Sequence, residues 1–94
     1  YNALSDALTA ISARLGLPHN DSLVIRFIVH SSFTIERSIR GEPLPYKKAD
    51  EYLQAHKELY QTIKAGLEPV QNLFNIRIPN TELAYLVEIF SDYV

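Results

Sequence analysis

The stretch from Asn20 to Arg40 contains neither glycine nor proline, and this absence constrains the fold more than any other feature. It opens on two residues that cap helices well, Asn20 and Asp21, and Gly41 and Pro43 follow its end. These signals predict one long helix over Asn20 to Arg40. Apolar residues occupy more than one side of this helix, which is typical of a helix at the centre of its domain. One side gathers Val24, Ile25, Ile28, Ile35 and Ile39, and a second side is flanked by Leu23, Phe27 and Phe33.

Four further segments carry apolar residues at the three- or four-residue spacing of amphipathic helices. An internal proline predicts a bend between Ala65 and Pro69. No segment alternates like a strand, and no internal repeat is visible. The sequence therefore predicts an all-α fold, a single compact bundle of about five helices. Besides the central helix, the expected helices lie at Asn2 to Leu15, within Lys47 to His56, at Lys57 to Phe74, and from an N-cap at Asn80 onward.

The 94 residues suit one domain, and 47% hydrophobic with 21% charged residues is an ordinary globular composition. The chain has a net charge of −2, whereas nucleic-acid-binding domains usually carry an excess of Lys and Arg. We therefore expect contact with nucleic acid only through a domain outside this sequence. The chain starts with Tyr1 rather than Met, so we expect residues 1–94 to be a single domain excised from a longer protein.

The chain has no cysteine, which removes disulfides, thiolate nucleophiles and thiolate metal sites. No apolar run reaches the roughly 18 residues of a membrane span. We expect a cytoplasmic protein with no membrane partner.

His30 points away from the large apolar side of the central helix, and Arg26 and Arg37 share its face. A neutral imidazole is a nucleophile, and a phosphoryl group placed on it would add negative charge beside two guanidinium groups. The arginines have a structural alternative, in which they pair with Glu82, Glu88 or Asp92 across helices. On the same helix, Glu36 is placed to pair with Arg40, one turn later.

Other kinds of site find little support. His19, His30 and His56 lie on separate elements, without a metal-ligating partner at helical spacing, so we expect no metal site and no other cofactor. The adjacent Ser31 and Ser32 diverge from His30 on a helix, and no glycine-rich phosphate loop exists. We expect no catalytic residues and no enzymatic activity.

Several motifs together resemble the PTS regulation domain, or PRD, and they cover nearly the whole chain. They are His30, Glu36-Arg37, Gly41-Glu42-Pro43, Leu73-Phe74-Asn75-Ile76, Ile78-Pro79, Glu82 and Tyr85-Leu86. The resemblance implies an all-helical module of a bacterial transcriptional antiterminator or activator in carbohydrate utilisation. A phosphocarrier or sugar-specific component of the phosphotransferase system would phosphorylate it on histidine, and this would change its dimer packing. By this resemblance His30 is the acceptor and Arg37 is the arginine that accompanies it, and Arg26 lies on the same face.

The sequence departs from the family pattern at Ile89, where many members carry a second histidine. Three hypotheses stay open: a domain that works with one phosphorylation site, a helical dimerisation module without phosphorylation, and a small helical enzyme that binds an anionic substrate. We expect a homodimer, because aromatic and apolar residues exceed what one small bundle buries. The expected interface is the stripe of Tyr85, Ile89 and Tyr93, together with the side that carries Phe27 and Phe33. We also expect Arg37→Ala to leave the fold intact.

Overall fold

A computed structural model describes residues 2–94, and within that range the chain forms five α-helices and no strand. The all-α prediction is confirmed. The helices are α1 (Asn2–Leu15), α2 (Asp21–Arg40), α3 (Ala49–Ala55), α4 (Lys57–Phe74) and α5 (Asn80–Ser91).

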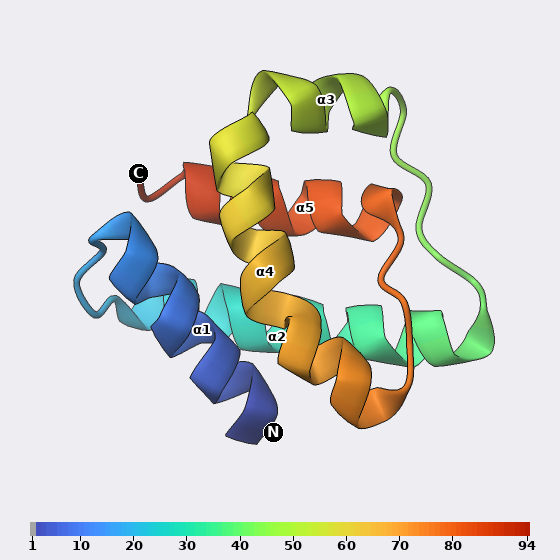
Figure 1. Ribbon diagram of the computed structural model, residues 1–94, viewed down its shortest axis with the longest axis horizontal. Coiled ribbons are helices and arrows are strands. Elements are labelled where there is room, and N and C mark those ends of the chain that lie inside the picture. The colour runs from blue at the N-terminus through green and yellow to red at the C-terminus, as the bar shows by residue number, and fades with distance from the viewer. Residues whose placement is uncertain (1) are drawn as a thin grey trace.

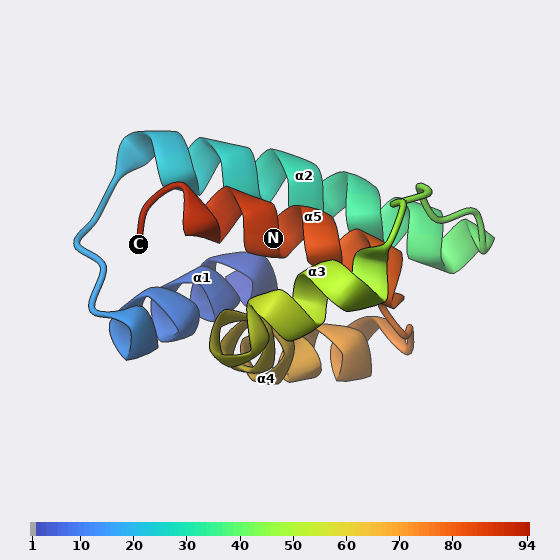
Figure 2. The ribbon, with the colours of Figure 1, turned by 90° about the horizontal axis from the view of Figure 1, so that it is seen from above.

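The helices pack as two antiparallel pairs that cross each other (Figure 1). Helix α1 lies along α4, and α2 lies along α5, so that segments distant in sequence become neighbours. The view from above separates the α2–α5 pair from the α1–α4 pair, with α3 beside α5 and α4 (Figure 2). The core lies between the two pairs, and its largest fully buried side chains include Phe27 of α2 and Phe90 of α5, whose rings meet edge to face.

The two ends of α2 follow the predicted signals. The Asn20 side chain accepts a hydrogen bond from the Leu23 N–H at 3.1 Å and so caps the first turn. At the other end Gly41 takes a left-handed φ of +71°, and the Glu42 N–H donates to the Arg37 carbonyl. Only glycine adopts this conformation without strain, which explains why the helix stops there.

Helix α5 begins differently from the prediction. Pro79 rather than Asn80 takes the extended N-cap conformation, and Asn80 is the first residue of the helix. The Asn80 side chain instead accepts a hydrogen bond from the Tyr60 hydroxyl at 3.2 Å and donates one to Asp50 at 3.1 Å. Asn80 therefore joins α3, α4 and α5, a role that tertiary packing assigns and helix-capping statistics do not reveal.

The apolar residues of α2 divide between the core and the surface. The buried side centres on Leu23 and Phe27. Ile25, Val29 and Phe33 follow one another at four-residue spacing on the opposite side and are 63%, 51% and 54% exposed. We call these three residues the α2 ridge. This ridge is an apolar helix face that nothing in residues 2–94 covers.

Gly66 of α4 packs directly against Ile11 of α1. A Cβ at this position would lie 2.4 Å from Cγ1 of the fully buried Ile11. We expect Gly66→Ala to lower the free energy of unfolding by about 1–3 kcal/mol through overpacking, although alanine favours helix by about 0.5–1 kcal/mol over glycine. Urea unfolding of a double-mutant cycle with Ile11→Ala checks this, because Gly66→Ala should be neutral or stabilising once Ile11 is shortened. An equal loss in both backgrounds would contradict the prediction.

Candidate functional site

His30 lies on the side of α2 that faces α5 and is half-buried. Its ring packs against the ring of Tyr85 with centroids 5.7 Å apart. The Nε2 atom is buried and has no hydrogen-bond partner among residues 2–94. Burial, and then the positive charge of Arg37, lower the pKa of His30 below 6.5, while Glu82 opposes this shift. The imidazole is therefore neutral at pH 7, the form in which one ring nitrogen keeps a free lone pair.

A buried carboxylate acts on this histidine through its charge. Glu82 of α5 is completely buried, and each of its oxygens accepts two hydrogen bonds. Oε1 accepts from Thr34 Oγ1 at 3.1 Å and from Arg37 Nη2 at 2.8 Å. Oε2 accepts from Arg37 Nε at 2.7 Å and from the Leu44 backbone N–H at 2.9 Å. Burial alone would raise the pKa of Glu82, but these donors together hold the pKa below its ordinary value, so the carboxylate stays ionised.

Arg37 is committed to Glu82 in this structure. The two side chains form a bidentate pair, and the Arg37 side chain is only 17% exposed. This is the structural alternative considered for the arginines, and it changes the expectation for Arg37→Ala. Removal of one partner of a buried pair leaves an uncompensated charge, which is strongly destabilising. We therefore no longer expect that variant to leave the fold intact.

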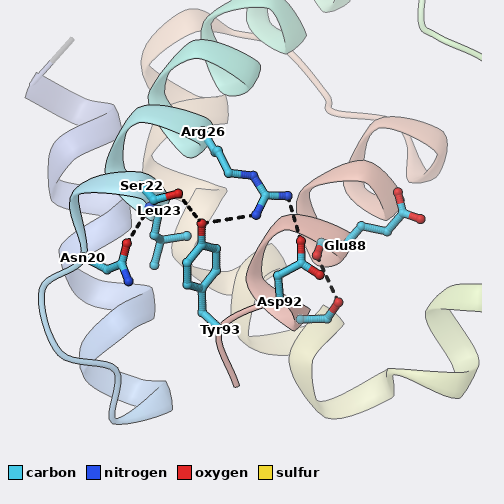
Figure 3. A network of polar contacts seen from close by, with 8 residues as sticks. Asn20, Ser22, Leu23, Arg26, Glu88, Asp92 and Tyr93 are labelled. Carbon is cyan, nitrogen blue, oxygen red and sulfur yellow. Dashed lines mark hydrogen bonds and ion pairs between the residues drawn. The ribbon is translucent and has the colours of Figure 1, made fainter.

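Arg26 also has partners, in the two residues that directly follow α5. Its Nη2 pairs with Asp92 at 2.9 Å, and its Nη1 donates to the Tyr93 hydroxyl at 3.2 Å. The Tyr93 hydroxyl also lies 2.8 Å from the Ser22 hydroxyl. The Arg26 guanidinium thus bridges the side chains of Asp92 and Tyr93 (Figure 3). Both members of the ion pair are well exposed, so this pair adds little stability.

The residues expected at a dimer interface have roles within the chain. Ile89 is 7% exposed and belongs to the core. Tyr85 is half-buried, and its hydroxyl donates to the Pro45 carbonyl at 2.6 Å, while Tyr93 is half-buried against Arg26. Phe27 is fully buried, whereas Phe33 is exposed. Ile89 and Phe27 are therefore not surface residues of this chain, and Phe33 of the α2 ridge is.

The other two histidines lie outside this site. His19 is exposed in the α1–α2 connection, with Nε2 2.7 Å from Asp21. His56 lies half-buried between α3 and α4, with its ring 4.4 Å from that of Tyr52. A surface pocket of about 460 Å³ between α1 and the start of α2 includes His19 but not His30. Across residues 2–94, no helix is long and apolar enough to cross a membrane, and no cluster of three or more acidic or histidine side chains is arranged to hold a metal.

Comparison with known proteins assigns the chain to a family. The model of the PRD domain matches residues 5–93. The chain belongs to the PRD domain family. The PRD chain is also 26% identical over 91 residues to the transcriptional regulatory protein LevR of Bacillus subtilis (strain 168). That alignment covers 97% of the chain and 10% of LevR, so the chain spans about a tenth of this relative's length. No solved structure matches the chain.

Within the PRD fold, the structure brings two of the three predicted phosphate-site residues together and separates the third. His30 and Arg37 both face Glu82 closely enough for its charge to affect them. Arg26 is bound to Asp92, the residue directly after α5. Sequence reasoning missed the Thr34 hydroxyl and the Leu44 N–H as hydrogen-bond donors to Glu82. Thr34 follows His30 by one helical turn, which is the only sequence signal for its place.

Proposed function

We propose that this PRD domain regulates a bacterial transcriptional regulator and that its input is a phosphoryl group on His30. The donor would be a phosphocarrier or sugar-specific component of the phosphotransferase system, in the cytoplasm. The observation that carries the proposal is a neutral histidine that packs against Tyr85, close enough to the buried Arg37–Glu82 pair for both charges to act on its pKa. Nucleic-acid contact and the response of a sugar-utilisation gene would belong to other parts of the longer protein, since the chain has a net charge of −2.

The transfer needs no metal ligand or general acid from this chain. A lone pair of a His30 ring nitrogen attacks the phosphorus of a donor that carries the phosphoryl group on an imidazole nitrogen. The new nitrogen–phosphorus bond forms as the bond to the donor nitrogen breaks. The His30 ring loses its N–H proton and the donor imidazole gains one, so protons balance. The lowered pKa of His30 supports this role because it keeps the nucleophilic form populated at pH 7.

The modified histidine would compete for an arginine that is already occupied. A phosphoryl group adds about two negative charges at neutral pH. Arg37 then has two anionic partners, the phosphoryl group and Glu82. A charge-assisted hydrogen bond contributes about 1.5–3 kcal/mol, and about 1.4 kcal/mol changes an equilibrium tenfold. Redistribution of Arg37 is therefore large enough to shift the packing of α2 against α5.

Incubation with the purified phosphocarrier system tests the proposal directly. The expected result is an acid-labile, base-stable phosphoryl label that mass spectrometry maps to His30. Failure to label the chain with every cognate donor would contradict phosphoryl signalling. That outcome would favour the second candidate function, a dimerisation module, which the isoleucine at the second histidine position and the exposed α2 ridge support.

Both candidate functions use self-association, and the α2 ridge is the surface we propose for it. Phe33 lies one turn from both His30 and Arg37 on α2, so a partner there would adjoin the phosphorylation site. We expect the chain to dimerise at micromolar concentration and Phe33→Asp to weaken the dimer at least tenfold. Leu73→Asp is the matched control, since Leu73 is 66% exposed on α4, away from the ridge. Sedimentation velocity checks this, and a monomeric wild type or an equal effect of Leu73→Asp would count against the ridge.

A further inference from the structure

Three consecutive residues of the loop between α2 and α3 form hydrogen bonds with α5. The Leu44 N–H donates to Glu82, the Pro45 carbonyl accepts from Tyr85, and the Tyr46 hydroxyl donates to Glu88 at 2.9 Å. We call Leu44–Tyr46 the anchored loop. Its three partners follow one another at three-residue spacing, so one side of α5 holds the whole loop.

Two of these three hydrogen bonds involve side chains that also contact His30 or Arg37 of the proposed phosphorylation site. Glu82 binds Arg37 with both oxygens while it holds Leu44. The ring of Tyr85 packs against His30 while its hydroxyl holds Pro45. The anchored loop and His30 therefore depend on the same pair of α5 side chains.

The loop leads into a strained residue. Lys48, immediately before α3, has a left-handed φ of +60°, which side chains with a Cβ rarely adopt. Such a conformation persists only where the surrounding structure holds it. Pro43 and Pro45 offer no backbone N–H, so the loop has few other means of attachment. Its position thus depends on the bonds to α5.

We propose that a phosphoryl group on His30 releases the anchored loop from α5. This inference rests on the proposed function. The new negative charge acts on the same buried site as the Glu82 carboxylate, whose charge already affects His30. It disfavours the ionised form of Glu82 and attracts Arg37 away from it. The group also occupies space next to the His30 ring, where Tyr85 now packs. Both changes weaken the bonds to Leu44 and Pro45, and relief of the Lys48 conformation favours the released state.

Amide hydrogen exchange of the Leu44 N–H, followed by NMR, tests the release. In the unmodified chain we expect this amide to be protected, because its acceptor is a fully buried carboxylate. Phosphorylation should speed its exchange at least tenfold. The Ile78 N–H is the internal control, since it donates to the Gln71 side chain at 2.8 Å in the α4–α5 connection, and its exchange should change less than twofold.

Two variants separate the contributions without phosphorylation. Tyr85→Phe removes the hydroxyl that holds Pro45 and keeps the ring against His30, and Glu82→Gln removes the charge and keeps the shape. Each should speed Leu44 exchange severalfold while Ile78 stays unchanged. A chain labelled on His30 whose Leu44 exchange is unaltered would overturn this inference and leave the proposed function standing. A chain that takes no label on His30 would overturn both.

Discussion

Glu82→Ala is expected to lower the free energy of unfolding by about 3–5 kcal/mol, the usual loss when one partner of a buried ion pair is removed. The reason is the number of groups that Glu82 satisfies. Without it the Arg37 guanidinium stays largely buried with no counter-charge, and the Thr34 hydroxyl and Leu44 N–H lose their acceptor. Urea unfolding followed by circular dichroism measures the loss.

Two controls give this prediction its specificity. Glu36→Ala removes an exposed carboxylate whose 3.5 Å pair with Arg40 confirms the predicted one-turn contact, and it should cost less than about 0.5 kcal/mol. Glu82→Gln keeps the shape and should cost less than Glu82→Ala. Equal stability of Glu82→Ala and wild type would show that the buried pair contributes nothing.

The same residue predicts a pH dependence. Because the pKa of Glu82 is lower in the folded chain than the ordinary 4.5, its ionised form contributes stability that is fully present above that value. This contribution is lost as the pH falls through the folded pKa. The difference in unfolding free energy between wild type and Glu82→Gln should therefore shrink on acidification below pH 4.5.

His30→Ala is expected to abolish the phosphoryl label completely. The chain has three histidines, and only His30 lies within a helix, where its ring packs against Tyr85. His19→Ala and His56→Ala should therefore keep the full label. His30→Gln, which retains a polar side chain of similar reach, should also lose it and serves as a variant less disturbing to the fold. Label that persists in either His30 variant would place the acceptor elsewhere.

The sequence predicted the helices well because their boundaries are local. Asn20 and Gly41 act within one turn of the ends of α2, so their signals could be interpreted without the fold. The start of α5 was misplaced by one residue because the Asn80 side chain is taken up by Tyr60 and Asp50, which are distant in sequence. The division of α2 between the core and the α2 ridge depends on which side α5 and α1 cover, and periodicity alone does not decide that.

The site was predicted less completely than the fold. Pairing of Arg37 with Glu82 could be named only as an alternative, because several carboxylates were at plausible spacing. The bond from the Leu44 N–H depends on the path of a loop with two prolines, which no residue pattern specifies. The burial of Ile89 likewise follows from helix packing. Residue types thus indicated the chemistry, and the contacts that control it came from tertiary structure.

The aromatic side chains around His30 give the domain an optical property of its own. Rings succeed one another from His30 through Tyr85, Tyr46 and Tyr52 to His56, with neighbouring centroids 4.4–5.7 Å apart. The chain has six tyrosines and no tryptophan, so no indole masks phenol emission. Three of those fluorophores belong to this row: Tyr46 is part of the anchored loop, and Tyr85 and Tyr52 pack against Tyr46. Half of the tyrosine fluorophores of the unlabelled chain therefore lie in the row of rings that starts at His30, and ultraviolet fluorescence can follow a change there without a dye or an engineered probe.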